Sequence, residues 1–253
     1  MEIICLGAGS STGTPVLGCG CPTCTSTNPC NKRTRCSTLV KADNGAQFLI
    51  DTGPDLRLQA LRENILHLDA VLYTHTHADH MNGIDDLRNF CYLQKSAIPV
   101  YGSRYTIENT RQRFGYAFSP PTGHWDKPVL SGHVLEAPEE IAGVTVTPVP
   151  IMHGKYPILA YRIGDFAYIT DVSEIPESSF ELLRGLSVLF LDCLHYTSHP
   201  THINFEQALD YTARIGAKTT YFIHMTHRVE YGEASAKLPA NVHLAYDGLR
   251  VNL

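Results

Sequence analysis

Six consecutive residues, His75-Thr76-His77-Ala78-Asp79-His80, place three imidazoles and one carboxylate directly after the apolar run 68–73. Imidazole nitrogens and carboxylate oxygens are common protein ligands of divalent transition-metal ions. Hydrophobic packing does not explain this cluster, because burying an imidazole or a carboxylate without a partner is unfavourable. The segment therefore predicts a metal site at the end of a strand.

The spacing within this segment indicates two directions of approach to a metal. If the strand continues through the histidines, His75 and His77 lie on the same side of it and can bind one cation. Asp79 and His80 fall in the turn that leads into a helix expected over residues 81–93, so they approach from another direction. This arrangement leaves room for a second ion beside the first.

Three further residues of ligand type stand singly at the ends of predicted strands. His153, Asp171 and His224 each come after an apolar run, where a loop can direct them into a shared cleft. Taken alone, each is explained equally well as an ordinary loop residue, since Asp and His are common in loops. Together with the histidine segment they indicate the remaining ligands of the same site.

Cysteines form a second cluster of a different chemical kind. Cys19, Cys21 and Cys24 place three thiols within six residues, a spacing suited to one tetrahedral zinc ion. Five of the eight cysteines lie between positions 19 and 36, in a chain with no export signal at its start. This favours metal binding over disulfide bonds.

The cysteine cluster needs a fourth ligand from elsewhere in the chain. We expect His227, which follows His224 by three residues and would join the N-terminal loop to the histidine-bearing edge. Cys30 and Cys36 remain alternative ligands. The prediction is a structural Zn in a loop at about residues 18–36.

Composition and charge limit the classes of partner. The chain has 253 residues and a formal net charge of -5, which argues against a protein that binds long nucleic acid through clustered cations. No segment approaches the roughly 20 consecutive apolar residues of a membrane span, and the N-terminus lacks a signal peptide's basic and apolar regions. We expect a cytoplasmic protein with no membrane partner.

Apolar strands alternate with amphipathic segments along the whole sequence, without a linker or a low-complexity stretch. This pattern predicts a single α/β domain over residues 1–253, built from two sheets with helices on their outer faces.

Taken in order, the candidate ligands resemble the motif series of the metallo-β-lactamase superfamily, beginning with Asp51 in Ile50-Asp51-Thr52-Gly53. The resemblance implies an αβ/βα sandwich of two mixed sheets with outer helices and two metals at one edge. It assigns three histidines to the first metal, two histidines and one aspartate to the second, and one bridging aspartate. These are His75, His77 and His153, then Asp79, His80 and His224, and finally Asp171. Asp51 would orient the ligands.

The cysteine loop, the pair His224 and His227, and the closing Tyr246-Asp247-Gly248 resemble the PhnP group of this superfamily. The resemblance implies a phosphodiesterase for a small phosphodiester, cyclic or linear. Two divalent metals (Mn, Zn or Fe) would share a hydroxide that attacks phosphorus, and Asp79 would accept a hydrogen bond from that hydroxide.

Cleavage of a phosphodiester also requires a proton donor for the leaving alkoxide. The resemblance places this general acid at His202, just before Asn204, in a loop that also contains His195 and His199. His199 is the alternative acid. Lys155 and the arginines of residues 104–113 are further candidates for binding the substrate phosphate.

Two other functions remain open. One is an RNA-processing nuclease of the same superfamily, to which His224-x-Thr226-x-Arg228 is faintly similar, although the acidic net charge disfavours it. The other is a non-hydrolytic metal-binding protein of cofactor biosynthesis, since a pyrroloquinoline quinone biosynthesis protein resembles the cysteine loop. A complete ligand set argues against the second. The expected partner is a small anionic phosphodiester, and a homodimer remains open.

Overall fold

The first strand, β1 (Glu2–Gly7), sends alternate side chains into two separate cores. Ile3 and Cys5 belong to a cluster of 47 buried apolar residues, whereas Ile4 and Leu6 belong to a second cluster of 20. Because side chains alternate along a strand, one face of this sheet packs against the other sheet and the opposite face packs against helices.

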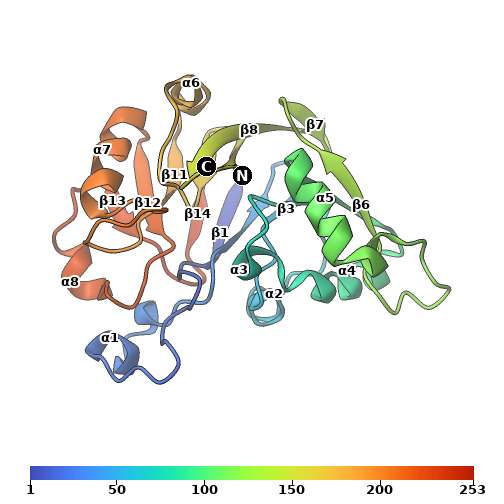
Figure 1. Cartoon of the computed structure of the whole chain (residues 1–253), viewed down its shortest axis with the longest axis horizontal. Helices are drawn as coiled ribbons and strands as arrows, with labels where there is room; N and C mark the ends of the chain where they lie inside the picture. Colours follow the sequence, from blue (N-terminus) through green and yellow to red (C-terminus); the bar gives the residue numbers. More distant parts are fainter.

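The computed structural model describes all 253 residues and contains two seven-stranded sheets (Figure 1). The strand order is β14-β1-β2-β3-β4-β5-β6 in the first sheet and β13-β12-β11-β10-β9-β8-β7 in the second. Each sheet mixes parallel and antiparallel pairs, which confirms the predicted architecture. The remaining strands are β2 (Ser37–Lys41), β3 (Gln47–Ile50), β4 (Ala70–Leu72), β5 (Ile98–Gly102), β6 (Leu130–Val134), β7 (Glu139–Ile141), β8 (Val144–His153), β9 (Tyr156–Ile163), β10 (Phe166–Ile169), β11 (Val188–Asp192), β12 (Thr219–Ile223), β13 (Val242–Leu244) and β14 (Arg250–Asn252).

Helices cover the outer faces of the two sheets, α2, α4 and α5 beside the first sheet and α7 beside the second (Figure 1). No helix is both long enough and apolar enough to cross a membrane. The α-helices are α1 (Pro22–Thr25), α2 (Leu56–Glu63), α3 (Ala78–Met81), α4 (Leu87–Gln94), α5 (Arg104–Arg113), α6 (Glu177–Phe180), α7 (Phe205–Ile215) and α8 (Tyr231–Ser235), and the 3-10 helices are η1 (Pro29–Asn31), η2 (Ile84–Asp86), η3 (Gly115–Phe118) and η4 (Glu181–Leu183).

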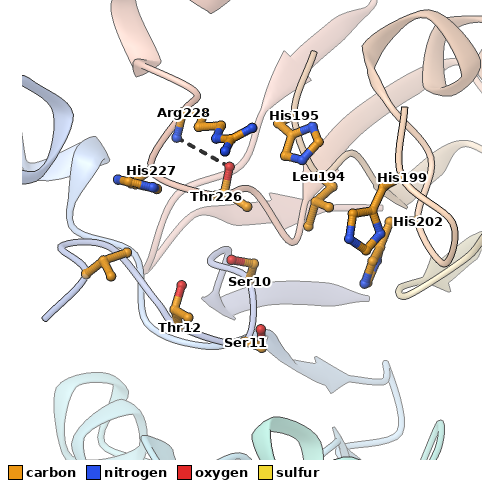
Figure 2. Close-up of a pocket in the computed structure, with 11 residues that line it drawn as sticks. Ser10, Ser11, Thr12, Leu194, His195, His199, His202, Thr226, His227 and Arg228 are labelled. Carbon is orange, nitrogen blue, oxygen red and sulfur yellow. Dashed lines mark hydrogen bonds between the residues drawn. The ribbon is translucent and has the colours of Figure 1, made fainter. Parts of the chain in front are cut away.

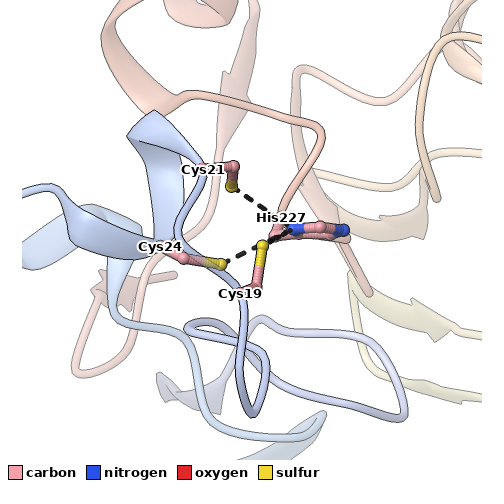
Figure 3. A group of neighbouring side chains, drawn as sticks. All are labelled: Cys19, Cys21, Cys24 and His227. Atoms are coloured by element: carbon pink, nitrogen blue, oxygen red, sulfur yellow. Dashed lines mark hydrogen bonds between the residues drawn. The ribbon is translucent and has the colours of Figure 1, made fainter.

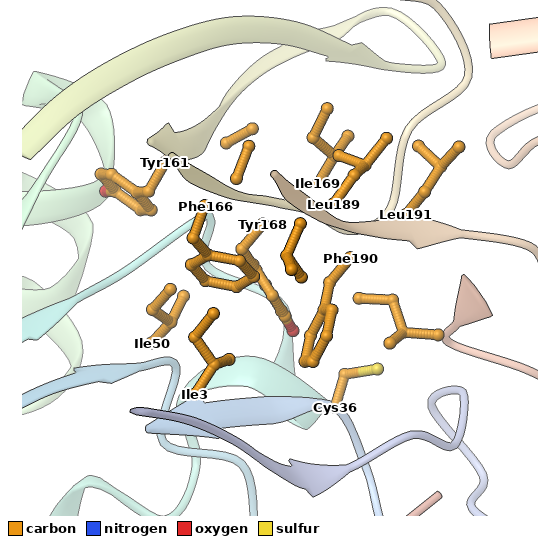
Figure 4. Close-up of a cluster of buried hydrophobic side chains, with 14 of the residues drawn as sticks. Ile3, Cys36, Ile50, Tyr161, Phe166, Tyr168, Ile169, Leu189, Phe190 and Leu191 are labelled. Atoms are coloured by element: carbon orange, nitrogen blue, oxygen red, sulfur yellow. The ribbon is translucent and has the colours of Figure 1, made fainter. Parts of the chain in front are cut away.

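Aromatic side chains fill the space between the sheets (Figure 4). Phe166 and Phe190 meet edge to face with ring centroids 5.2 Å apart, and both lie in the same buried cluster as Ile3 and Ile50 of the first sheet. This packing joins the sheets rigidly, so that loops from both can converge at one edge.

The helix expected over residues 81–93 is interrupted. The structure has three short pieces instead: α3, then η2, then α4. Gly83 explains the break, because its N–H donates to the Thr52 carbonyl (2.8 Å) and a Cβ at this position would lie 2.1 Å from the Gly53 carbonyl oxygen. This close approach fixes the short helix that carries Asp79 and His80 against the end of β3.

Candidate metal centre

The histidine segment lies in a loop beyond its strand. β4 ends at Leu72, so the argument from side-chain alternation along a continuing strand was wrong for His75 and His77. The two rings nevertheless lie together, with centroids 4.6 Å apart. Arg113 supports this loop, because its guanidinium donates a hydrogen bond to the Thr76 carbonyl (2.6 Å). The sequence did not predict this contact.

One group of potential ligands combines residues from both sheets. Ligand atoms of His75, His77, His153 and Asp171 all lie within 4.8 Å of one another. Nδ1 of His153 lies 2.8 Å from the Thr201 carbonyl, which leaves Nε2 of this ring as the ligand atom.

A second group shares Asp171 with the first. Asp79, His80, Asp171 and His224 also place ligand atoms within 4.8 Å of one another. Oδ1 of Asp171 lies 3.1 Å from Nε2 of His80 and 3.3 Å from Nε2 of His224. The structure thus brings together all seven residues that the sequence proposed for the two metals, with Asp171 common to both groups.

Unusual backbone conformations occur where strands deliver these residues. Asp51, Asp171 and His224 have φ angles of 62°, 54° and 59°, a left-handed conformation that costs a residue other than glycine roughly 1–2 kcal/mol. Each lies within two residues of the end of β3, β10 or β12. Surrounding structure must enforce this conformation, which turns each side chain toward the shared edge.

Two buried aspartates orient the ligands from behind. Asp51 lies 2.7 Å from Nδ1 of His80 and accepts a hydrogen bond from the Thr74 N–H (2.8 Å). Asp192 lies 3.2 Å from Nδ1 of His202 and 3.4 Å from Nδ1 of His224. The sequence predicted this role for Asp51 but missed Asp192. The missed signal was its position at the end of β11, where other strands of this sheet also present ligands.

The buried charges alter one another's pKa values. Burial and the neighbouring His80 charge lower the pKa of His75 well below its ordinary value. Burial would also lower the pKa of His224, but Asp171 and Asp192 raise it to about 10. Burial would raise the pKa of Asp171, yet His224 and His80 hold it well below the usual range. The carboxylates therefore require positive charge beside them.

Unpaired nitrogen atoms show that a cation fits this requirement. Nε2 of His75, His80 and His224 is buried in each case and makes no hydrogen bond. Leaving such atoms unpaired is costly, and all three belong to the two ligand groups. With imidazole and carboxylate donors at these distances, the arrangement is a divalent-metal site.

Of the three loop histidines, His202 lies against the ligand groups. Its Nε2 is 3.9 Å from Oδ2 of Asp171, and its ring centroid is 4.9 Å from those of His153 and His224. His199 is exposed and contacts Thr201 through Nδ1. The geometry thus favours His202 over His199 as a group that can reach a reacting atom.

The cysteine cluster forms a separate site (Figure 3). Sγ atoms of Cys19, Cys21 and Cys24 lie 3.3, 3.4 and 3.5 Å from Nδ1 of His227, and all four ligand atoms lie within 4.8 Å of one another. The structure places His227 here, and neither Cys30 nor Cys36 belongs to the group.

Among the cavities that adjoin the His/Asp groups or His202, two bear on substrate binding. One, of about 490 Å³, is lined by His75, His77 and His153 together with the exposed rings of Tyr105 and Tyr156. The other, of about 320 Å³, runs from His202 to His227 (Figure 2).

Comparison with known proteins agrees with this geometry. Residues 46–225 match the family described as the beta-lactamase superfamily domain. The chain belongs to the metallo-β-lactamase superfamily. A crystal structure of a diphosphatase from the PhnP family superposes with a TM-score of 0.92 at 39% identity, over 99% of this chain and 97% of that one. Within the superfamily, the chain is therefore similar to the PhnP family over nearly its whole length.

Two further proteins that are similar to this chain have names unrelated to PhnP. A protein named octanoyltransferase from Porphyromonas gingivalis is 40% identical over 255 residues, which cover 98% of this chain and 51% of that protein. The chain thus spans about half the length of this curated relative. Zinc-bound PqqB from Methylobacterium extorquens has a TM-score of 0.79 at 19% identity over the full length of both chains, which shows the shared fold alone.

Proposed function

We propose that this protein hydrolyses a small phosphodiester with the aid of two divalent cations, one in each His/Asp group. The observation that carries the proposal is Asp171, which belongs to both groups and can bridge two ions. His202 beside it completes a site for phosphoryl transfer. The PhnP-family diphosphatase, at 39% identity, supports chemistry at phosphorus.

When bound, the two cations would activate a water molecule and neutralise the non-bridging oxygens of the phosphate. His75, His77 and His153 would hold one ion, Asp79, His80 and His224 the other. The metals would be Mn, Zn or Fe, because a mixed site of imidazoles and carboxylates is less selective than thiolates.

The protein's own groups then position the reactants and move the proton. Asp79 can accept a hydrogen bond from the attacking water as well as hold a metal. Asp192 fixes Nδ1 of His202 at 3.2 Å, so Nε2 faces Asp171 and can donate a proton to the leaving oxygen. We assign His202 as the general acid on this geometry.

The structural zinc is a second part of the proposal. Cys19, Cys21, Cys24 and His227 form a closed set of four ligands of the Cys₃His type, which is typical of structural zinc. This ion would fix the N-terminal loop to the segment that follows β12 and would leave no open position for a substrate.

Activity on a panel of esters tests the proposed function. We expect the metal-loaded protein to hydrolyse bis(p-nitrophenyl) phosphate and at least one small diester, such as a 2′,3′-cyclic nucleotide. It should act poorly on p-nitrophenyl phosphate, because a doubly charged monoester is less electrophilic and can bind both metals unproductively. The Asp171→Asn variant is the inactive control, and its metal content and rate are measured alongside those of the wild-type protein.

The same panel separates the alternatives. A precursor tRNA should be a poor substrate, since the net charge of -5 gives little attraction for a polyanion. An octanoyl thioester covers the chemistry that the name of the Porphyromonas gingivalis relative suggests. Preference for the tRNA or the thioester over every small diester would overturn the proposal, and turnover of none would favour a non-hydrolytic role.

A further inference from the structure

The cavity beside His202 has properties that the proposed metal chemistry does not use. It lies between the loop after β1 and the segment after β12, with Ser10, Ser11 and Thr12 facing Arg228 and His195 (Figure 2). His202 and His199 form one end of it. Because His202 is the proposed proton donor, a leaving group released at the metals would lie at this end.

The cavity carries positive charge and no negative charge. Arg228 is its only permanently charged lining residue, and no aspartate or glutamate lines it. The guanidinium of Arg228 is exposed and makes no hydrogen bond or ion pair; only its backbone N–H is bonded, to Thr226 Oγ1 (3.3 Å). Burial and the nearby Arg228 charge lower the pKa of His195.

The acidic residue that follows Arg228 in sequence, Glu230, forms hydrogen bonds elsewhere. Glu230, two residues further along, accepts hydrogen bonds from the Asn31 amide (2.5 Å) and the Glu233 N–H (2.8 Å). It therefore serves the start of α8 and leaves the guanidinium free. An arginine with no protein partner at the wall of a cavity is suited to an anionic group of a ligand.

Hydroxyl groups complete the opposite wall. Ser10 is 98% buried as a residue (2% exposed), yet its Oγ makes no hydrogen bond within the protein, although it lines the cavity. The backbone N–H groups of Ser11 and Thr12 also have no protein acceptor, because the turn there is closed by Gly13 N–H to the Ser10 carbonyl (2.8 Å). Ser10 is buried, whereas Ser11 and Thr12 are exposed. This wall therefore offers free donors that a ligand entering from solvent can reach.

We infer that this cavity is a second anion subsite, in which Ser10, the Ser11–Thr12 turn and Arg228 bind a phosphate carried by the leaving group. The inference rests on the proposed function. It specifies a substrate whose departing half is itself anionic. In the reaction, water adds to the attacked phosphorus, the bond from that phosphorus to the leaving oxygen breaks, and the leaving group departs with its own phosphate held in the subsite.

Two esters that transfer the same thymidylyl group test the subsite. Attack at the α-phosphorus of thymidine 5′-monophosphate p-nitrophenyl ester releases p-nitrophenolate, which carries no phosphate, whereas attack at the α-phosphorus of dTDP-glucose releases glucose 1-phosphate. Arg228→Gln should lower kcat/KM for dTDP-glucose by about 30-fold through KM, the loss expected for one charge-assisted hydrogen bond. The same variant should change kcat/KM for the nitrophenyl ester by less than about 3-fold, because Arg228 would make no contact with the nitrophenolate leaving group.

Further variants control for structure and charge. Ser10→Ala should lower kcat/KM for dTDP-glucose alone, by about 5-fold, which is the effect of one neutral hydrogen bond. Arg228→Lys keeps the positive charge, so its kcat/KM for dTDP-glucose should fall less than that of Arg228→Gln. Arg57→Gln removes another exposed arginine that has no hydrogen bond or ion pair and lines neither cavity, so it should leave both values unchanged. Because Arg228 follows His227, zinc content and melting temperature are measured for each variant.

The outcomes separate the subsite from the proposed function. Equal losses on both esters in Arg228→Gln with unchanged zinc content, or wild-type turnover of the nitrophenyl ester without turnover of dTDP-glucose, would overturn the subsite and leave the hydrolase intact. If the wild-type protein cleaves neither of the two thymidylyl esters nor bis(p-nitrophenyl) phosphate, the proposed function itself is overturned.

Discussion

The two clusters of ligand-type residues in this protein differ in burial, charge and connection to the backbone. The His/Asp groups are buried except for His77, contain two aspartates, and place Asp171 and His224 in a left-handed backbone conformation. The cysteine group is half exposed, contains no carboxylate, and follows an irregular loop around the four-residue helix α1. Both groups draw on the segment from His224 to His227.

This difference separates a site built for reaction from one built for structure. In the His/Asp groups, two sheets and their strained strand ends hold imidazoles whose Nε2 atoms, in His75, His80 and His224, make no hydrogen bond within the protein. In the cysteine group, four ligands converge on one point and join two chain segments that are far apart in sequence. We therefore expect changes at the first cluster to affect rate, and changes at the second to affect stability first.

Removal of the shared aspartate should have the largest effect. Asp171→Ala deletes the carboxylate common to both groups, so we expect activity on bis(p-nitrophenyl) phosphate to fall at least about 1,000-fold, the upper range for loss of one electrostatic group in an active site. Metal analysis should show loss of active-site metal with retention of the structural zinc. Loss of zinc from the cysteine group as well would show that the two clusters are not independent.

The general-acid assignment predicts an effect that depends on the leaving group. His202→Ala should slow diesters with alkoxide leaving groups by about 100-fold, the lower range of general acid catalysis, and slow nitrophenyl esters only slightly, since nitrophenolate needs little protonation. Metal content should not change. Equal slowing of both classes, or loss of metal, would contradict the assignment, and His199→Ala provides the matched control.

Asp192 should have a smaller effect on the same step. Asp192→Asn keeps the volume but weakens the contacts to His202 and His224, so we expect a loss of about 10-fold, typical of residues that orient a ligand from behind. As expected for His202→Ala, diesters with alkoxide leaving groups should be slowed more than nitrophenyl esters, but by a smaller factor. A full rate with every ester would show that Asp192 has only a packing role.

The cysteine cluster should respond to acid before the overall fold does. The Cys24 backbone N–H, followed by His227, lowers the pKa of Cys21 to about 6 from the ordinary 9.0. A thiol with a depressed folded-state pKa contributes its full stabilisation above its ordinary pKa and loses it as the pH falls through about 6. Zinc should therefore be retained at neutral pH and released near pH 5, as measured by a chromogenic chelator.

Substitution at the same cluster should change activity least. Cys21→Ser should lower the melting temperature, because zinc bound to the native loop stabilises the fold, while the rate at 25 °C stays within about 3-fold of wild type, as expected for a site away from the reacting atoms. A loss of rate as large as that of Asp171→Ala with active-site metal intact would show that the cysteine group takes part in catalysis.

The sequence predicted which side chains cluster more accurately than it predicted the elements that carry them. Chemistry restricts which residues can bind a metal, so the grouping of His75, His153 and Asp171 could be predicted without coordinates. The local geometry was less predictable: β4 ends before His75, and the helix after it is interrupted because Gly83 packs against Gly53. Backbone contacts of this kind leave no pattern in hydrophobic periodicity.

Residues that act through other side chains were also harder to predict. Asp192 and Arg113 support the site by contacts to His202 and to the Thr76 carbonyl, and such contacts depend on tertiary structure. Asp51 was an exception because its motif carried the resemblance to a known family. Ser10 and Arg228 belong to segments that are distant in sequence, and only the folded chain shows that they line one cavity.

Metal content and phosphodiesterase activity measured on the same preparation test the central claim most directly. The wild-type protein, prepared without chelators, should contain one tightly held zinc and up to two exchangeable divalent ions. Its rate on bis(p-nitrophenyl) phosphate should rise and fall with the exchangeable ions while the zinc stays constant. Activity that is unchanged after all the exchangeable metal has been removed, or no activity in fully loaded protein, would contradict the account.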